Sequence, residues 1–265
     1  MAEDVLRKIY AAKAEHLKTE MAREPYEEIR ERARASVASR RHFLKILKAR
    51  SGDAIVAEIK RASPSAGLIA RDFDPVAIGK LYQRAGADAI SILTESDHFL
   101  GDLAFVAAVR SATALPLLRK DFLTTPYQVA QSAAYGADAI LLIVGGLTDE
   151  QMRAALDEAR AYDLDALVEV HDLHDLDRAL ALGVDFVGVN NRNLRTMITD
   201  LAVSEHILPR VPPNVFAITE SGMRDIVDVE RLRRAGARGF LIGEALMRAD
   251  DPAALLASLK HVHAH

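Results

Sequence analysis

Charged side chains occur where short apolar runs of the sequence end. Residues 57–60 read Ala-Glu-Ile-Lys, 118–121 read Leu-Arg-Lys-Asp, and 167–171 read Leu-Val-Glu-Val-His. Glu58 and Lys60 are two residues apart, so they would lie on one face of an extended strand. A carboxylate beside an ammonium can move protons, and an ammonium can stabilise charge that develops on a carbonyl oxygen. These segments favour acid–base chemistry.

Three later apolar runs also end in polar residues. Residues 189–193 read Val-Asn-Asn-Arg-Asn, 219–222 read Thr-Glu-Ser-Gly, and 242–244 read Ile-Gly-Glu. Gly222 and Gly243 would let backbone N–H groups approach a phosphate closely. The segments 219–222 and 242–244 therefore predict a phosphate-binding end of the site. The alternative is that Gly222 and Gly243 only form tight turns.

Each of these charged residues alone could have a purely structural role. A Lys or Glu at a strand end is usually solvated or salt-bridged, and pairing of Glu58 with Lys60, or of Lys120 with Glu169, is the structural alternative. Several charges gathered in one place cost stability unless they pair or bind a ligand. Because six segments carry such residues together, we expect a ligand site.

Eight apolar runs could position these residues, and helical patterns of 10–15 residues separate them. The runs lie near 54–60, 88–94, 116–120, 139–144, 166–170, 186–190, 215–219 and 239–243. Regular alternation of strands with helices predicts βα units around a parallel sheet. In a closed barrel, the residues at the carboxyl ends of the strands would converge on one mouth.

An internal repeat supports eight units. Gly-Ala-Asp-Ala-Ile occurs at 86–90 and 136–140, with looser copies at 183–187 and 236–240. Each glycine would close a helix in a left-handed conformation before a strand. The predicted fold class is α/β, a (β/α)8 TIM barrel. An open doubly wound sheet is the alternative, but it more often has a glycine-rich loop after its first strand, which residues 60–65 lack.

The first 50 residues differ from the rest of the chain in composition and in the spacing of their apolar residues. They are rich in Lys, Arg, Glu and Ala, and Leu6, Ile9 and Tyr10 belong to an apolar pattern with helical spacing. We expect two or three amphipathic helices there. The predicted organisation is a helical extension over residues 1–50 and a barrel over residues 51–265, together forming one structural domain.

Composition limits the possible partners. The 265-residue chain has a formal net charge of −4 and no cysteine, which argues against a nucleic-acid or anionic-membrane partner, disulfides and thiolate metal sites. The histidines are scattered and make a poor metal site. No apolar run is long enough to span a membrane, and the N-terminus lacks a signal-peptide pattern, so a cytoplasmic location is expected.

The motifs together resemble the indole-3-glycerol-phosphate synthase family. The matching stretches include A-E-I-K-R-A-S-P-S-A-G at 57–67, L-R-K-D-F at 118–122, L-V-E-V-H at 167–171, G-V-N-N-R-N-L at 188–194 and L-I-G-E-A-L-M at 241–247. The likeness extends from about residue 40 to residue 252. It implies a barrel with helices over its mouth, no metal or organic cofactor, and a monomer that could associate with other tryptophan-pathway enzymes.

The resemblance also implies the reaction. The phosphorylated substrate would be 1-(2-carboxyphenylamino)-1-deoxyribulose 5-phosphate, and the products indole-3-glycerol phosphate, CO2 and water. Lys120 would protonate the substrate carbonyl, Glu169 would assist the later dehydration with Glu58, and Lys60 would meet the substrate carboxylate and reach toward the phosphate. Asn190 would orient the hydroxylated chain. The implied substrate-binding residues are Ser63, Phe99, Phe122, Leu141, Arg192, Glu220, Ser221, Gly222, Ile242 and Gly243.

Within that set, Phe99, Phe122 and Leu141 would surround the aromatic ring, and Glu220 would join the glycines at the end that holds sugar hydroxyls and phosphate. One position departs from the family pattern, because many members have a Lys where this chain has Ala66. One loop cation is therefore missing.

Two other functions were weighed. A phosphoribosylanthranilate isomerase would use a Cys base, and the chain has no Cys. A non-catalytic ligand-binding barrel would be expected to have lost Lys120, Glu169 or Glu58, and all three are present. An acidic role for Lys120 would be helped by a pKa lowered from about 10. Burial and Lys60 would lower it while Glu58 and Glu169 would raise it, and the residues alone leave that balance open.

Overall fold

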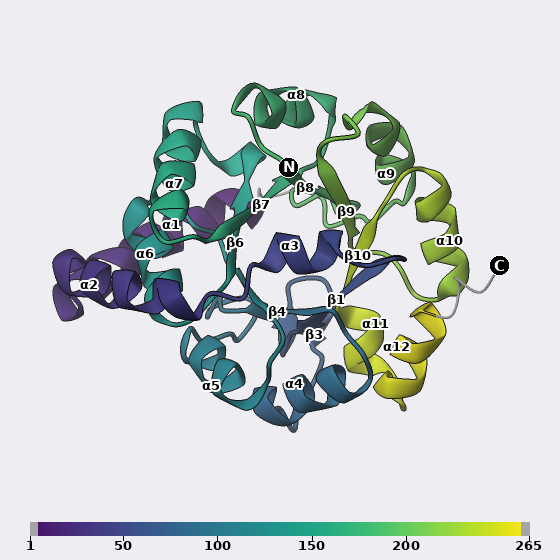
Figure 1. Ribbon diagram of the computed structural model, residues 1–265, viewed down its shortest axis with the longest axis horizontal. Coiled ribbons are helices and arrows are strands. Elements are labelled where there is room, and N and C mark those ends of the chain that lie inside the picture. Colours follow the sequence, from purple (N-terminus) through teal and green to yellow (C-terminus); the bar gives the residue numbers. More distant parts are fainter. Residues whose placement is uncertain (1–4, 261–265) are drawn as a thin grey trace.

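The computed structural model describes residues 5–260, within which eight parallel strands close into a barrel (Figure 1). The strands are β1 (Ala54–Ile59), β4 (Ala89–Leu93), β5 (Leu117–Lys120), β6 (Ala139–Ile143), β7 (Asp165–Val170), β8 (Phe186–Asn190), β9 (Phe216–Glu220) and β10 (Gly239–Ile242). They follow one another in sequence order, and β10 pairs with β1. The predicted (β/α)8 barrel is confirmed, and closure excludes the doubly wound sheet.

Helices surround the barrel. They are α4 (Pro75–Arg84), α5 (Ala104–Ala112), α6 (Pro126–Ala134), α7 (Asp149–Ala161), α8 (Leu173–Ala181), α9 (Ala202–Ile207), α10 (Ile226–Arg234), α11 (Glu244–Arg248) and α12 (Pro252–Lys260), with short 3-10 turns η2 (Val144–Gly146) and η3 (Leu208–Arg210). A small antiparallel hairpin, β2 (Ala62–Ser63) and β3 (Gly67–Leu68), follows β1. None of the helices in the described part of the chain could cross a bilayer.

The alternation of side chains along each strand creates two apolar layers. One layer lies between the sheet and the outer helices. The other fills the barrel interior and includes Val56, Leu118, Leu141, Leu167, Phe186, Ile218 and Leu241. Because every second residue faces inward, Glu58 follows Val56 into the interior, Lys120 follows Leu118, and Glu169 follows Leu167.

The repeated glycines have the backbone that their positions predict. Gly86, Gly136, Gly183 and Gly236 have φ angles of +88°, +90°, +73° and +113°. Each comes just after the end of a helix and two or three residues before a strand. The left-handed conformation needs glycine there, since a Cβ would strain the backbone.

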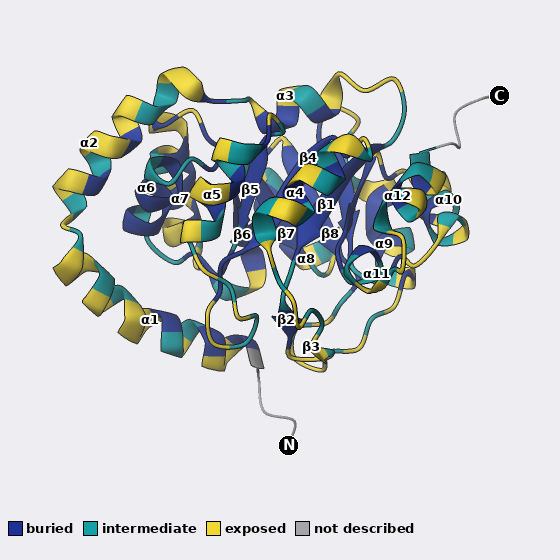
Figure 2. Cartoon of the chain, turned by 90° about the horizontal axis from the view of Figure 1, so that it is seen from below, coloured by how far each residue is buried: buried dark blue, intermediate teal, exposed yellow. Residues whose placement is uncertain are grey.

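The N-terminal extension is helical, as expected, with α1 (Val5–Arg23), α2 (Tyr26–Ser36), the turn η1 (Val37–Ser39) and α3 (Phe43–Lys48). The α2 helix packs along α6 on the side of the barrel. In Figure 2, α1 lies at the same end of the molecule as the β2–β3 hairpin, whereas α3 lies at the opposite end.

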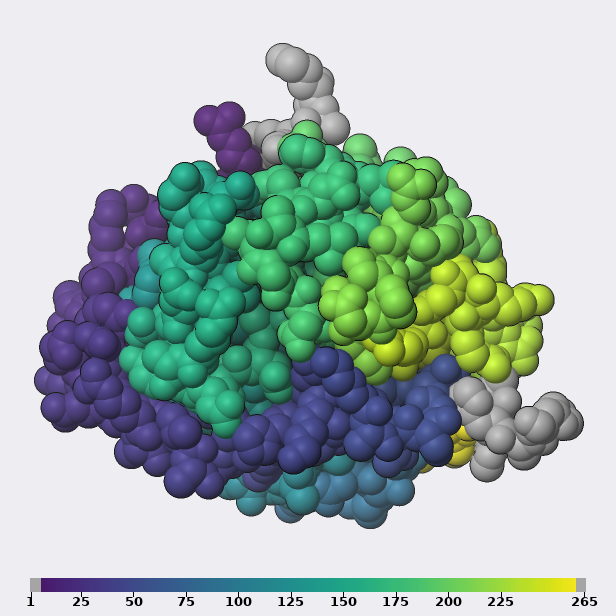
Figure 3. Space-filling view, turned by 45° about the horizontal axis from the view of Figure 1, so that its top comes forward, coloured from purple at the N-terminus to yellow at the C-terminus, as the bar shows by residue number. Residues whose placement is uncertain are grey.

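The expectation that all of residues 1–50 lie over the mouth is therefore wrong for α3. Phe43 packs against Phe186, with ring centroids 6.1 Å apart, and Phe186 in turn packs against Phe216. Phe186 and Phe216 are the first residues of their strands. The Leu44 N–H donates to the carboxylate of Asp165 at the start of β7 at 2.8 Å. The helix closes the amino-terminal end of the barrel, and Figure 3 shows this blue segment lying against surfaces formed by later parts of the chain.

The α1 helix is attached to the mouth by buried contacts. Lys13 Nζ lies 2.6 Å from Asp121 Oδ1, and both side chains are almost fully buried. Tyr10 packs edge-on against Phe122 with ring centroids 5.8 Å apart. Since Asp121 and Phe122 directly follow β5, α1 is docked on the segment that carries Lys120.

Candidate active site

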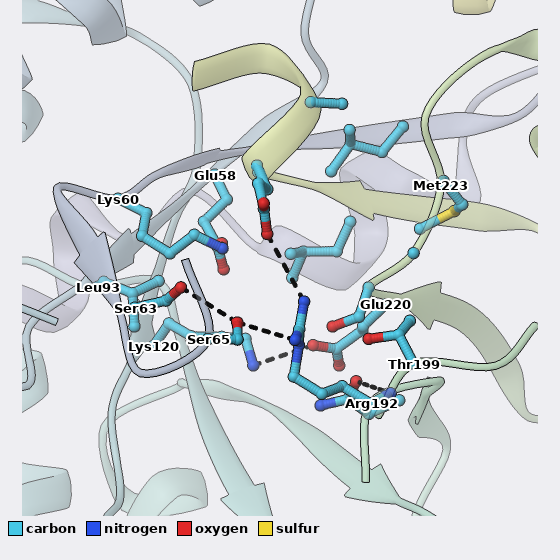
Figure 4. A pocket seen from close by; sticks show the side chains of 18 of the residues that line it. Glu58, Lys60, Ser63, Ser65, Leu93, Lys120, Arg192, Thr199, Glu220 and Met223 are labelled. Atoms are coloured by element: carbon cyan, nitrogen blue, oxygen red, sulfur yellow. Dashed lines mark hydrogen bonds and ion pairs between the residues drawn. The ribbon is translucent and has the colours of Figure 1, made fainter. Parts of the chain in front are cut away.

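A cavity of about 970 Å³ opens at the carboxyl ends of the strands. Its lining contains all the residues that the sequence singled out: Glu58, Lys60, Ser63, Phe99, Lys120, Phe122, Leu141, Glu169, Asn190, Arg192, Glu220, Ser221, Gly222, Ile242 and Gly243. Side chains from separate strands thus face one space, and Figure 4 shows several of them converging.

The centre of the cavity is a network of ion pairs. Lys60 Nζ lies 2.8 Å from Glu58 Oε1. Lys120 Nζ lies 3.0 Å from Glu169 Oε2 and 3.0 Å from Glu220 Oε2. The Glu58–Lys60 and Lys120–Glu169 ion pairs, which are the structural alternative to a ligand site, both form. All four residues nevertheless line a ligand-sized cavity. The contact between Glu220 and Lys120 differs from the expectation that Glu220 lies with the phosphate end.

The electrostatic balance at Lys120 favours the ammonium. Burial alone would lower the pKa of this group, but the attraction of Glu169, Glu220 and Glu58 is larger. The pKa of Lys120 therefore lies above its usual range, and the ammonium form is favoured. The lowered pKa that would have made it a stronger acid is not observed.

The two glutamates that share Lys120 titrate differently. Burial raises the pKa of Glu220 to about 7, and repulsion by Glu169 and Glu58 adds to this effect while Lys120 opposes it. Burial also disfavours the Glu169 carboxylate, but Lys120, the nearby His171 and a 3.1 Å hydrogen bond from Asn190 Nδ2 outweigh it, and the pKa of Glu169 is lowered. The site holds one ionised carboxylate beside one that gains and loses a proton near neutral pH.

Glycines make room for two of the buried carboxylates. A Cβ on Gly188 would overlap Oε1 of Glu220, and a Cβ on Gly243 would overlap Oε1 of Glu58. The sequence reasoning assigned Gly243 only to phosphate binding and did not select Gly188. A glycine inside a strand often marks a close approach, and this signal could have identified Gly188.

Apolar side chains form another part of the cavity lining, called here the apolar wall. Phe99, Phe122 and Leu141 line it, joined by Leu93 and Ile143. The Phe99 and Phe122 rings lie 6.1 Å apart between centroids with planes inclined at 37°. Such a wall suits a flat aromatic ring and lowers the local dielectric, which strengthens the charge interactions nearby.

The predicted phosphate end has a special backbone. Ser221 and Gly222 have φ angles of +65° and +89°, and Gly243 precedes the first turn of α11. Three Asn191 hydrogen bonds, to Thr219 Oγ1 and to the carbonyls of Glu220 and Ser221, hold the segment after β9 in place. A non-glycine residue in the left-handed region is strained and typical of functional sites.

Two arginines that bracket this end are bound to the hairpin after β1. Arg192 Nη1 donates to Ser65 Oγ at 2.9 Å, and an Arg248 N–H lies 3.5 Å from the carbonyl of Ala66. Glu244 lies 3.3 Å from Arg248 Nε and 3.6 Å from Arg192 Nη2. The repulsion that Glu244 would exert on a phosphate is thus partly neutralised. Sequence reasoning missed Arg248 because its approach to Ala66 joins segments far apart in the chain.

A closed (β/α)8 barrel that gathers buried carboxylates, lysines and apolar side chains at the carboxyl ends of its strands is a TIM-barrel enzyme. The family model for indole-3-glycerol phosphate synthase matches residues 6–259. The chain belongs to the indole-3-glycerol phosphate synthase family. It is a carboxy-lyase of tryptophan biosynthesis, which closes, decarboxylates and dehydrates its substrate to form indole-3-glycerol phosphate.

Individual relatives agree with the family match. The indole-3-glycerol phosphate synthase of Koribacter versatilis is 49% identical over 212 residues, 80% of this chain and 82% of that one. That of Acidithiobacillus ferrooxidans is 44% identical over 252 residues, 94% and 95% of the two chains. Among solved structures, KGPDC from Streptococcus mutans has a TM-score of 0.59 at 14% identity and covers 79% of this chain and 96% of its own. That likeness supports the barrel fold alone.

The two alternative functions, a phosphoribosylanthranilate isomerase and a non-catalytic ligand-binding barrel, are therefore wrong.

Among the described residues, no group of three or more His, Cys, Asp or Glu side chains could hold a metal ion.

Proposed function

We propose that Lys120 is the general acid of ring closure. Its ammonium contacts two buried carboxylates in the cavity that the apolar wall also lines, and a substrate ring on that wall would bring its carbonyl oxygen to Lys120. Transfer of the proton, or a strong hydrogen bond, would stabilise the oxyanion that forms as the ring carbon attacks. The single observation that carries this proposal is the pair of 3.0 Å contacts that hold Lys120 in place.

The remaining groups would complete the reaction. Glu169, whose ionised form is favoured, would accept a proton during dehydration together with Glu58. Lys60, partly exposed beside Glu58, would meet the substrate carboxylate and reach toward the phosphate. Asn190 would hold Glu169 and the hydroxylated chain. An apolar wall around the carboxylate favours its loss as CO2, because the carboxylate is less well solvated there than in water.

The other polar residues would bind the ends of the substrate. Ser221, Gly222 and Gly243 would offer backbone N–H groups to the phosphate, with Ile242 beneath them and Ser63 on the opposite hairpin. Arg192 would orient the carboxylate and the sugar chain. Glu220 would bind the sugar hydroxyls, as the family resemblance implies, and would also take part in proton transfer because it contacts Lys120.

We further propose that residues 1–50 and 51–265 act as extension and barrel of one cytoplasmic monomer, which could associate with other tryptophan-pathway enzymes. The burial of Lys13 against Asp121 supports the unity of the two parts. Gel filtration of the full chain with light scattering would test the monomer.

The decisive test is the Lys120→Ala variant, assayed through the fluorescence of the indole product. Loss of one well-placed acid should lower kcat by about 10²–10⁴-fold while KM changes much less. Lys80→Ala, an exposed lysine on α4, is the matched control and should keep normal turnover. Near-normal kcat in Lys120→Ala would contradict the assignment.

A further inference from the structure

His171 contacts the buried Glu169 from outside the substrate cavity. The residue follows β7, and its Nε2 lies 3.3 Å from Glu169 Oε1. Among the described residues that line the cavity, Glu169 is included and His171 is not. The His171 side chain nevertheless keeps an exposed fraction of 20%, whereas that of Glu169 is 1%. The imidazole thus lies between a buried carboxylate and solvent.

The other edge of the imidazole faces a second carboxylate. His171 Nδ1 lies 3.8 Å from Asp175 Oδ2 on α8, and the His171 backbone N–H donates to the same oxygen at 3.2 Å. Asp175 N–H in turn donates to the Asp172 side chain, which caps α8. These contacts fix the backbone of His171 and leave its ring between Glu169 and Asp175.

The charged groups with the largest effect on His171 are acidic, and the nearest cation across Glu169 is Lys120. Glu169 on β7 and Asp175 on α8 contact His171, and Glu220 on β9 acts at longer range. Burial disfavours the imidazolium, but these carboxylates outweigh it, so the pKa of His171 is raised. Tyr10 of α1 packs against Gly146 close to Glu169, and burial raises its pKa further from neutrality, so Tyr10 does not compete for protons. The surroundings of His171 therefore favour the imidazolium form.

The chemistry of the family consumes one proton in each turnover. The substrate carboxylate leaves as CO2, and the carbonyl oxygen leaves as water after it has taken up two protons. Formation of the indole double bond returns one proton from carbon. Each turnover therefore takes one proton from solvent. A substrate that fills the cavity would cover the remaining exposed part of Lys120, which is 13% of its side chain, so a second route for protons to Lys120 would be useful.

We propose that His171 is the proton inlet of this active site. The N–H bond at His171 Nε2 breaks and an O–H bond forms at Glu169 Oε1. The Glu169 carboxyl group then rotates and transfers that proton to the free amine of Lys120, which has given its own proton to the substrate. The neutral imidazole turns to solvent and takes a proton from water. The first step, to the Glu169 carboxylate, is uphill because the pKa of Glu169 is lowered and that of His171 is raised. The overall transfer from His171 to Lys120 runs downhill because the Lys120 amine is far more basic than imidazole.

This inlet rests on the proposed roles of Lys120 and Glu169. His171 acts through Glu169 and does not touch the substrate, so it is a positioning residue with a proton-transfer function. The 3.0 Å contact between Lys120 and Glu169 and the 3.3 Å contact between Glu169 and His171 form a continuous route from solvent to the amine.

The test is a single-turnover experiment on the full chain with enzyme in excess over the carboxyphenylamino-deoxyribulose phosphate. His171→Gln retains an N–H donor for Glu169 but cannot carry a proton. Product fluorescence should appear about 10–100-fold more slowly than in the wild type, with substrate affinity nearly unchanged. Added imidazole should restore part of the rate, and the loss of rate that the wild type shows as His171 deprotonates should be absent. His174→Gln, an exposed histidine on α8, is the matched control.

Two results would overturn the inlet. One is a wild-type rate and pH profile in His171→Gln. The other is a slow rate that imidazole does not restore, which would show a structural role. Glu169→Gln separates this failure from that of the site assignment: full activity in Glu169→Gln would refute the proposed roles on which the inlet depends, whereas an inactive Glu169→Gln beside a normal His171→Gln would refute the inlet alone.

Discussion

The carboxylate of Glu220 lies against the bare backbone of Gly188, and a Cβ on that glycine would overlap Oε1 of the glutamate. Both residues face the barrel interior on neighbouring strands, where Gly188 pairs in register with Ile218, two residues before Glu220. The absence of a side chain at Gly188 leaves the space that this buried carboxylate occupies while it contacts Lys120.

A methyl group at this position should therefore disturb the proton chemistry. Gly188→Ala should push Glu220 away from Lys120 and lower kcat by about 10–100-fold, since a small displacement of a catalytic group is costly. Gly145→Ala, where the nearest atom to the new methyl group would be at an ordinary 3.7 Å, is the control. Steady-state kinetics would measure kcat of both variants. An unchanged kcat in Gly188→Ala would show that turnover does not depend on the present position of Glu220.

Removing the charge of Glu220 should stabilise the fold while it reduces activity. The folded-state pKa of about 7 lies above the unfolded value of about 4.3, so the contribution of this group to stability is complete below about pH 4 and is lost as pH rises through 7. Glu220→Gln should gain about 3 kcal/mol over the wild type at pH 8 and little at pH 4. Urea unfolding at the two pH values measures this, and an equal difference at both would contradict the raised pKa.

Breaking the buried pair between α1 and the mouth should destabilise the protein. Lys13→Met leaves Asp121 with Arg119, 3.0 Å away, and Thr94, 2.7 Å away, as partners. We expect a loss of about 2–4 kcal/mol near neutral pH. Lys18→Met, which removes an exposed pair with Glu15, should cost less than about 1 kcal/mol.

The same pair has a definite pH dependence. Burial raises the pKa of Asp121, but Lys13 and Arg119 outweigh it, and the net shift is downward. Its stabilisation is present above the unfolded pKa of about 3.9 and is lost as pH falls below that value. The difference between wild type and Lys13→Met in thermal unfolding should therefore narrow in acid, and a difference that widens there would be incompatible with the ion pair.

Arg192 should affect substrate binding more than turnover. It holds Ser65 of the hairpin at 2.9 Å and the carbonyl of Met197 at 3.2 Å. Arg192→Met should raise KM about tenfold and change kcat less, because a hydrogen bond to a charged group contributes about 1.5–3 kcal/mol. Arg195→Met in the same loop is the control. If KM of Arg192→Met stays within twofold, neither the hairpin nor the substrate depends on this side chain.

The strands were predictable because each is a short apolar run bounded by a glycine or a charged residue. All eight predicted runs lie within one residue of an observed strand at either end. The period of two also placed Glu58 and Lys60 on one face, and the ion pair between them agrees with that placement.

What the sequence could not supply were contacts between distant segments. The apolar pattern of α3 shows that one face is buried but not which end of the barrel buries it, and Phe43 packs at the amino-terminal end. The approach of Arg248 to Ala66 joins residues 182 apart. The contact of Glu220 with Lys120 depends on Gly188, whose importance appears only once two strands are paired.

The position of α3 constrains how the chain can be assembled. Residues 43–48 are made early during synthesis. Phe186, which packs against Phe43, and Phe216, which packs against Phe186, are made last but one and last among the aromatic residues of the barrel-interior cluster. Until those strands have been synthesised, the apolar face of α3 stays exposed and is prone to non-native contacts and aggregation. Docking of α3 onto the amino-terminal end of the barrel should therefore be one of the last events of folding, although α3 is among the first segments to be synthesised.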